Sequence, residues 1–192
     1  VNVHHFASQI VGYLKDNDNF GTDIRVSDET DKLLDTGGGI KKAAPLFDSD
    51  KPVLIHNVDI LSNVDLAHLY AMHGDSAATL VVSSRKTKRY LLFDDDMRLK
   101  GWTNIETGEV RSPYPDLNVA DCRMFAFSGI HVISPSMFGL MDEFPDKFGI
   151  IDFYLKVCDK VVIKGYDKTD LRLMDVGKLD TLAEAENFIN QL

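Results

Sequence analysis

The sequence predicts an α/β domain whose mostly parallel sheet is covered by helices, and three observations point to that class. Short apolar runs, one starting at Val53 and another over residues 77–83, are typical of strands buried on both faces. Residues 64–73, closed by Gly74, form a segment with helical character between those two strands. The resulting strand, helix, strand, helix alternation is the order expected of a parallel sheet with helices on its faces.

The first half of the chain justifies this class element by element. Apolar residues at Phe6, Ile10 and Leu14 recur every four positions and predict a helix over residues 4–15. A polar turn, a short strand at residues 22–26 and an acidic connector at residues 28–34 follow. Residues 36–39 read as a glycine loop that runs into a helix ending near Pro45.

The second half continues the alternation after a stretch of hairpins. Asp94, Asp95 and Asp96 sit between two short strands, and neighbouring carboxylates on an exposed tip repel, so we expect a turn and not a metal site. Ser128-Gly129 interrupts the apolar segment 122–133, which indicates a bulge or a close approach to the backbone. The remaining expected elements are helices at 135–141, 150–158 and 178–192 and strands at 161–166 and 171–175.

Composition restricts the partners. The chain of 192 residues carries a net charge of −9, which argues against a nucleic-acid binder. No apolar run approaches the ~20 residues needed to cross a bilayer, so we expect no membrane partner. Cys122 and Cys158 are far apart without metal-like spacing, which favours reduced cysteines in a cytoplasmic protein. The six histidines form no metal-like or triad-like set, so we interpret them as core or surface residues.

Two features suggest nucleotide chemistry. The strand that begins at Val53 opens into His56, Asn57 and Asp59, so the Asp59 carboxylate would emerge where open α/β sheets bind their ligands. The glycine loop lies just upstream of that strand. A flexible loop beside a carboxylate at a strand end is typical of a site for a phosphorylated ligand.

With these residues, the chain resembles the sugar-1-phosphate nucleotidyltransferases, most closely the bacterial mannose-1-phosphate guanylyltransferases and related uridylyltransferases. Three motifs carry the resemblance in the expected order: Thr36-Gly37-Gly38-Gly39-Ile40, Asn57-Val58-Asp59 and Asp175-Val176-Gly177. Weaker matches at residues 125–131 and 151–152 extend it over nearly the whole chain. The resemblance implies a Rossmann-like, mixed but mostly parallel sheet with helices on both faces, in one domain over residues 1–192.

The resemblance also implies a reaction and a set of site residues. The family joins a nucleoside triphosphate to a sugar 1-phosphate and releases pyrophosphate. Asp59 and Asp175 would be the catalytic pair that holds Mg²⁺, a hard ion that needs only one or two carboxylates besides substrate phosphates. Nucleotide binding falls to Thr36, Gly37, Gly38, Gly39 and Asn57. Sugar binding falls to Gly129 and Lys147.

One departure from the family is serious. Its members begin with a G-x-G-T-R loop followed by Pro-Lys, which wraps the triphosphate, whereas this chain begins at Val1 in what looks like the tail of a strand. We therefore expect an N-terminally truncated domain that lacks its first strand and phosphate loop. We expect little or no turnover from this chain by itself.

Several alternatives stay open at this point. The chain could be a non-catalytic module of the same fold that binds or senses sugar nucleotides. Asp59 and Asp175 could be turn or helix-capping carboxylates, and the glycines a plain strand-to-helix turn. A Rossmann-type oxidoreductase is disfavoured because no G-x-G-x-x-G follows a strand. The nucleobase, the sugar and association into a homo-oligomer are left undetermined.

Overall fold

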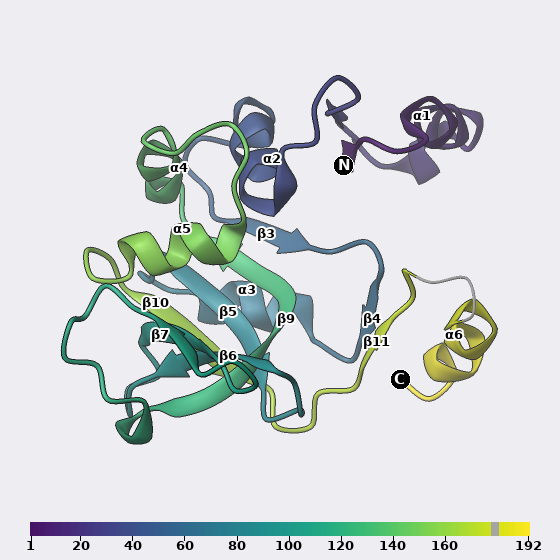
Figure 1. The fold of residues 1–192 in the computed structure, drawn as a ribbon. Coiled ribbons are helices and arrows are strands. Elements are labelled where there is room, and N and C mark those ends of the chain that lie inside the picture. The colour runs from purple at the N-terminus through teal and green to yellow at the C-terminus, as the bar shows by residue number, and fades with distance from the viewer. Residues whose placement is uncertain (178–180) are drawn as a thin grey trace. The chain divides into compact units, whose positions relative to one another are not determined.

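The computed structural model describes residues 1–177 and 181–192 and divides into two compact units. Unit 1 comprises Val1–Lys51 and Phe138–Tyr154, and unit 2 comprises Pro52–Met137 and Leu155–Leu192. The described α-helices are α1 (Ala7–Asp16), α2 (Asp35–Ala43), α3 (Leu66–Met72), α4 (Ser136–Met141), α5 (Ile150–Val157) and α6 (Leu182–Ile189) (Figure 1). Short 3-10 turns are η1 (Asp18–Gly21), η2 (Ala44–Leu46) and η3 (Val119–Asp121).

The described strands alternate with these helices (Figure 1). They are β1 (Asn2–Val3), β2 (Ser27–Asp28), β3 (Val53–His56), β4 (Ile60–Ser62), β5 (Ala78–Ser83), β6 (Arg89–Phe93), β7 (Leu99–Asn104), β8 (Glu109–Arg111), β9 (Arg123–Ile133), β10 (Ile163–Asp167) and β11 (Leu173–Asp175). The predicted α/β class with a mixed sheet is confirmed.

Unit 2 is built on a seven-stranded mixed sheet in which β9 is the hub. The order is β10-β5-β9-β6-β7-β8, and β3 also pairs with β9. β10 runs parallel to β5, whereas β3 and β5 each run antiparallel to β9. Because β9 runs the other way, β3, β5 and β10 share one direction and their carboxyl ends reach the same edge of the sheet.

The strand at Val53 differs from the prediction. All four residues of β3 are half-buried, and its only strand partner among the described residues is β9. β3 is therefore an edge strand and is not a strand buried on both faces. By contrast, every residue of β5 is buried, as its unbroken apolar run predicts.

α3 covers one face of this sheet because its apolar side packs on β5 and β9. Leu69 is fully buried and joins Val81, Ile130 and Val132 in one cluster. The Asp65 side chain accepts a hydrogen bond from the His68 backbone N–H at 2.9 Å and caps the helix. Burying one leucine side chain contributes about 2 kcal/mol.

In unit 1 the three glycines are part of a helix, which corrects the predicted glycine loop. α2 begins at Asp35, so Gly37, Gly38 and Gly39 form its first turns and are buried. A Cβ on Gly37 would overlap the Phe148 ring, and one on Gly38 would overlap the Asp146 carbonyl. The bare backbone lets this end of the helix pack directly on the segment 146–148.

The start of unit 1 also differs from the prediction. The strand expected at residues 22–26 is displaced to β2, because Ser27 and Asp28 pair in parallel with Asn2 and Val3 of β1. A short strand forms only where another strand can pair with it, and β1 pairs with residues 27 and 28 and not with residues 22–26.

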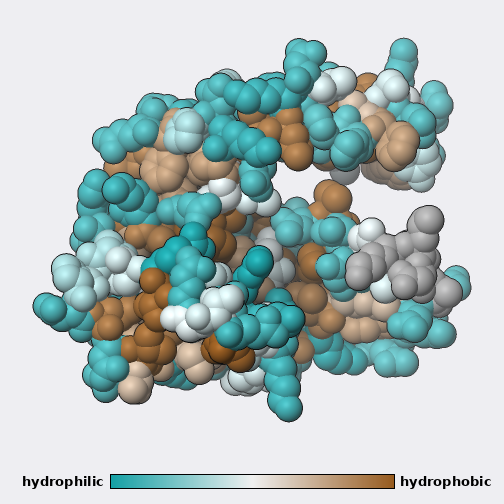
Figure 2. Space-filling model, viewed as in Figure 1, coloured by the Kyte–Doolittle hydropathy of each residue, from teal (hydrophilic) through white to brown (hydrophobic). Residues whose placement is uncertain are grey.

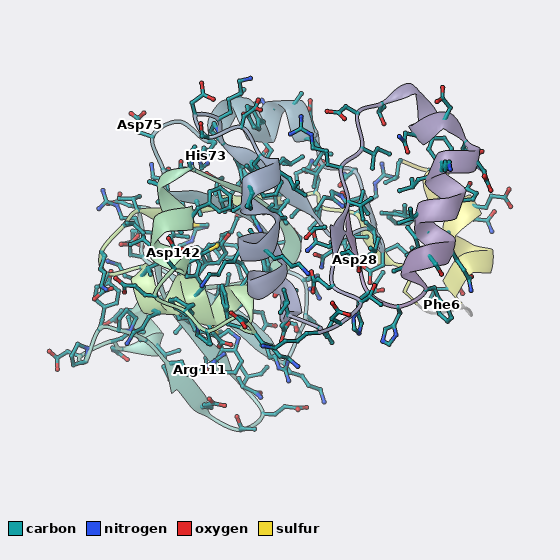
Figure 3. The ribbon with its side chains drawn as sticks, turned by 90° about the horizontal axis from the view of Figure 1, so that it is seen from above. Phe6, Asp28, His73, Asp75, Arg111 and Asp142 are labelled. Carbon is teal, nitrogen blue, oxygen red and sulfur yellow. The ribbon has the colours of Figure 1, made fainter. Side chains whose placement is uncertain are left out.

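The predicted first helix exists as α1, but its apolar residues face outward. Phe6, just before the helix, is 72% exposed and projects from it (Figure 3), and Ile10 is 37% exposed. Figure 2 shows the resulting brown and tan surface over α1. At the other terminus, α6 begins at Leu182; residues 178–180 of the predicted last helix lie outside the described residues.

Candidate functional site

Asp59 and Asp175, far apart in sequence, are brought together by a pair of short strands in unit 2. Asp59 occupies the turn between β3 and β4, and Asp175 ends β11. β11 pairs antiparallel with β4, with Asp175 opposite Ile60. The Val176 backbone N–H donates to the Asp59 carbonyl at 2.8 Å, which fixes the two backbones side by side.

The two carboxylates converge on Gly177. A Cβ built on Gly177 would lie 3.0 Å from Asp59 Oδ2 and 3.1 Å from Asp175 Oδ1. Both oxygens therefore border the same small space, and a side chain at this position would fill it. The Gly177 backbone N–H donates to Asp175 Oδ1 at 2.9 Å and orients that carboxylate.

This donor set fits Mg²⁺. The half-buried Asp59 and the exposed Asp175 supply hard oxygen ligands, and Mg²⁺ completes an octahedral shell with water and substrate phosphates. Within residues 1–177 and 181–192, no group of three or more histidine, cysteine or acidic side chains is placed to hold a metal ion. Among the described residues, the pair therefore lacks the third and fourth protein ligands of a closed structural metal site.

Asn57 and Gly129 form a second contact beside this pair. Gly129 has a φ of +82°, which favours glycine, and a Cβ there would lie 2.8 Å from Asn57 Nδ2. The pairing of β9 with β5 shifts register across this point, which is the predicted bulge. The Ser128 hydroxyl donates to the Val81 carbonyl at 2.9 Å and accepts from the Ile130 N–H at 3.2 Å, so polar groups freed by the bulge are satisfied.

The other predicted site residues belong to unit 1. Thr36 Oγ1 accepts a hydrogen bond from the Ile150 backbone N–H at 3.0 Å, tying α2 to the start of α5. A Cβ on Gly39 would lie 2.6 Å from both Asn2 Nδ2 and Glu29 Oε1, a partly buried hydrogen-bonded pair. Packing thus accounts for all three glycines, and their contact with a nucleobase stays a prediction. Lys147 is exposed, and its contact with the sugar also stays a prediction.

Two buried histidines in unit 2 act as core residues. His73 shares hydrogen bonds of 2.9 Å with Thr79 Oγ1 and Ser134 Oγ, and burial lowers its pKa. His131 stacks on Phe127 with ring centroids 5.5 Å apart, and complete burial lowers its pKa to about 3. Both rings are neutral at pH 7, as expected of histidines with structural roles.

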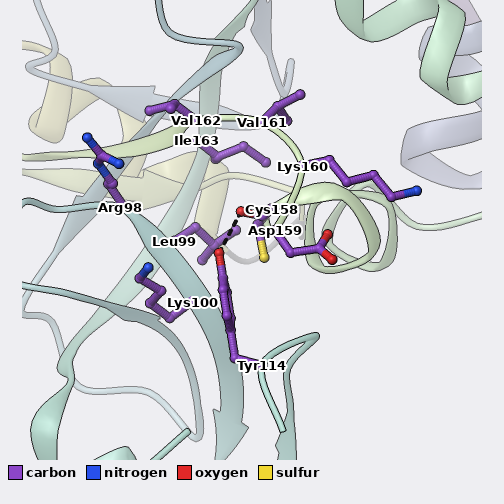
Figure 4. Close-up of a pocket in the computed structure, with 10 residues that line it drawn as sticks. All are labelled: Arg98, Leu99, Lys100, Tyr114, Cys158, Asp159, Lys160, Val161, Val162 and Ile163. Atoms are coloured by element: carbon purple, nitrogen blue, oxygen red, sulfur yellow. Dashed lines mark hydrogen bonds between the residues drawn. The ribbon is translucent and has the colours of Figure 1, made fainter. Parts of the chain in front are cut away.

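A pocket of about 180 Å³ lies elsewhere in unit 2 (Figure 4). Leu99, Tyr114, Cys158 and Ile163 line it, and the Tyr114 hydroxyl donates to the Cys158 carbonyl at 2.9 Å. Burial raises the pKa of the Cys158 thiol to about 11, so this cysteine is an unreactive thiol. The pocket adjoins Ile163, where β10 begins, whereas ligands of open α/β sheets bind where the parallel strands end.

Sequence reasoning missed two features of the site. Gly177 was seen only as part of a motif, although it is the residue that leaves room between the carboxylates. The sequence analysis did not single out Arg85, whose guanidinium donates to the Phe127 carbonyl at 3.0 Å, two residues before Gly129. The run of basic residues 85–89 in an acidic chain was a signal that could have revealed it.

Comparison with solved structures places this geometry in a known fold. HddC from Yersinia pseudotuberculosis, solved in complex with GMP-PN, superposes with a TM-score of 0.70 at 19% identity, over 97% of this chain and 76% of that one. The inositol-1-phosphate CTP transferase of T. maritima gives a TM-score of 0.71 at 12% identity, over 99% of this chain and 74% of that one. This chain has the fold of the sugar-1-phosphate nucleotidyltransferases.

A third neighbour with this nucleotidyltransferase fold is a UDP-glucose pyrophosphorylase from Acinetobacter baumanii. It gives a TM-score of 0.63 at 12% identity, over 95% of this chain and 69% of that one. No family model matches the sequence. In the described part of the chain, no helix is long and apolar enough to cross a bilayer.

Proposed function

We propose that residues 1–192 form a single nucleotidyltransferase domain of an enzyme that joins a nucleoside triphosphate and a sugar 1-phosphate to give an NDP-sugar and pyrophosphate, and that this chain by itself has little or no turnover. The observation that carries the proposal is the convergence of Asp59 and Asp175 on the bare backbone of Gly177. The shared fold supports it, because solved structures with this fold include a CTP transferase and a UDP-glucose pyrophosphorylase.

The chemistry requires positioning and charge neutralisation more than acid–base work. The sugar phosphate oxygen attacks the α-phosphorus in line, and pyrophosphate leaves from the opposite side. Asp59 and Asp175 would hold Mg²⁺, which when bound supplies positive charge between the phosphates of the two substrates. Gly177 keeps the space between the carboxylates open.

The remaining site residues would bind the nucleobase, the sugar and the sugar phosphate. Asn57 lies against the half-buried Gly129, whose backbone would lie under the sugar ring, where a side chain would collide with it. The α2 segment from Thr36 to Gly39 would contact the nucleobase, and Lys147 the sugar phosphate. GTP and mannose 1-phosphate are the substrate pair that we propose.

A second candidate function is a module that binds sugar nucleotides without turnover. Packing inside unit 1 accounts for Gly37, Gly38 and Gly39, so these glycines do not require a catalytic role. Such a module would bind NDP-sugars and release no pyrophosphate under any substrate combination.

Three variants test the proposal. Asp59→Asn and Asp175→Asn each remove one carboxylate charge, and Gly177→Ala places a methyl group between the carboxylates. We expect each variant to weaken Mg²⁺-dependent NDP-sugar binding, measured by calorimetry. In a protein extended by a G-x-G-T-R loop, each should lower pyrophosphate release at least about 100-fold, since such interactions contribute roughly 3 kcal/mol to a transition state.

The matched control is Asp95→Asn, which removes one carboxylate from the exposed hairpin turn and should change neither quantity. Pyrophosphate release is assayed with the five common nucleoside triphosphates against a panel of sugar 1-phosphates, in this chain and in the protein extended by the G-x-G-T-R loop. Undiminished Mg²⁺-dependent binding in Asp59→Asn would refute the metal assignment. NDP-sugar binding without pyrophosphate release in the protein extended by the G-x-G-T-R loop would favour the module.

A further inference from the structure

A basic loop follows β5 in a chain that is otherwise strongly acidic. Residues 85–89 contain four cations, Arg85, Lys86, Lys88 and Arg89, although the whole chain has a net charge of −9. All four side chains belong to exposed residues. Lys88 pairs with Glu106 at 2.8 Å, whereas Arg85 and Lys86 pair with no carboxylate of the described chain.

The loop lies at the edge of the sheet where the proposed site is built. β3 and β5 run in the same direction on the two sides of β9, so both end at this edge. Asn57 and Asp59 follow β3, and Arg85 follows β5 after one intervening residue. Strands on the two sides of a common neighbour are about 10 Å apart, a span that one sugar with its substituents can bridge.

Arg85 is held beside the stretch of β9 that includes Gly129. Its guanidinium donates to the Phe127 carbonyl at 3.0 Å, two residues before Gly129, while Asn57 Nδ2 lies over Gly129 itself. One hydrogen bond leaves the guanidinium four further N–H donors. A ligand on the bare backbone of Gly129 would therefore have Asn57 and Arg85 as neighbours.

The charge of Arg85 indicates what it binds. In the proposed function Asp59 and Asp175 bind the phosphates through Mg²⁺, so we assign the Arg85 side of the site to the sugar. Neutral hydroxyl groups do not require a cation, whereas a carboxylate matches the planar, bidentate donor set of arginine. An unpaired arginine with a lysine next to it favours an anionic partner.

We propose that Arg85 is a specificity-determining residue that binds a carboxylate on the sugar, so that the chain prefers acidic sugars over their neutral counterparts. The inference rests on the proposed function and revises its sugar: a carboxylate-bearing sugar 1-phosphate, such as mannuronate 1-phosphate, would be preferred over neutral mannose 1-phosphate. It does not depend on which nucleobase is bound.

The experiment measures NDP-sugar affinity by calorimetry in the presence of Mg²⁺. The probes are two matched pairs, UDP-glucuronate with UDP-glucose and GDP-mannuronate with GDP-mannose, which differ at the sugar carboxylate. We expect the acidic member of the bound pair to bind at least about tenfold more tightly. Arg85→Gln should abolish this preference while leaving the affinity for the neutral member within about twofold.

Arg89→Gln is the matched control, because it removes the same charge from the first residue of β6, at the end of the same basic segment, without touching the Phe127 carbonyl. It should retain the preference. Equal affinities for both members in the wild-type chain, or an equal loss of preference in Arg85→Gln and Arg89→Gln, would overturn the inference and leave the proposed function intact. Absence of binding for all four ligands would instead overturn the proposed function, and the inference with it.

Discussion

His131 shows how a single buried group makes stability depend on pH. Burial lowers its pKa from 6.5 to about 3, so the folded state keeps this ring neutral at pH values where the unfolded chain protonates it. The unfolded state therefore binds more protons below pH 6.5, and the free energy of unfolding falls as the pH decreases through that value. His73, whose pKa is also lowered, contributes in the same direction.

We expect the free energy of unfolding to decline from pH 7 to pH 5 by up to about 1.4 kcal/mol per pH unit for each such histidine. His131→Phe keeps an aromatic ring against Phe127 and should make the decline shallower. Urea unfolding followed by the fluorescence of Trp102, the one tryptophan of the sequence, measures the free energy of unfolding of the wild type and the variant at each pH. The same slope in wild type and variant would show that His131 does not carry this dependence.

At the same scale, the sequence indicated candidate residues for the site but not their arrangement in space. Asp59 and Asp175 could be paired only through the resemblance to a family, because nothing local relates two residues so far apart. Their convergence depends on the antiparallel pairing of β4 with β11, a long-range event. Gly177 and Arg85 were overlooked for the same reason, since their importance comes from neighbours that are remote in sequence.

At the scale of elements, the sequence pattern predicted helices and strands correctly wherever local preference and tertiary packing favour the same structure. The apolar run of β5 and the serine-glycine interruption of β9 predicted a buried strand and a bulge, and both are present. The triple glycine read as a loop because glycine is a poor helix former. Contact with the segment 146–148 overrides that preference, and no sequence pattern announces such a contact. Nothing in the sequence indicated that β2 pairs with β1.

The helical glycines allow a paired test of this account. Gly12 in α1 has open space around its Cβ position, whereas a Cβ on Gly38 in α2 would overlap the Asp146 carbonyl. Alanine in a helix interior is normally more stable than glycine by roughly 0.5–1 kcal/mol. We expect Gly12→Ala to follow that rule and Gly38→Ala to reverse it, with a loss of about 1–3 kcal/mol from overpacking.

Thermal unfolding followed by far-ultraviolet circular dichroism compares the two variants with wild type. A stability change of opposite sign in the two variants separates a packing effect from intrinsic helix propensity. A stabilised Gly38→Ala variant would mean that α2 does not pack on residues 146–148 through its bare backbone.

At the scale of the whole molecule, burial is distributed very unevenly. All six residues of β5 are buried, and its neighbour β9 contributes the fully buried Ile130, Val132 and Ile133. In α1 only Ala7 is buried, and Tyr13 is 61% exposed. Local opening requires less free energy where few apolar contacts must be broken.

We therefore expect hydrogen exchange to rank the elements in that order. Amides of β5 and the second half of β9 should exchange only through the global unfolding of unit 2, whereas amides of α1 should exchange through local fraying with little protection. Exchange followed by mass spectrometry on peptides covering these elements measures the ranking. Leu69→Ala provides the internal check. Truncating this side chain leaves a cavity in the cluster under α3 and lowers the free energy of unfolding by about 2–5 kcal/mol. Exchange in β5 and β9 should accelerate by the corresponding factor. Protection of α1 equal to that of β5 would contradict this distribution of stability and would show that the apolar side chains of α1 are covered in solution.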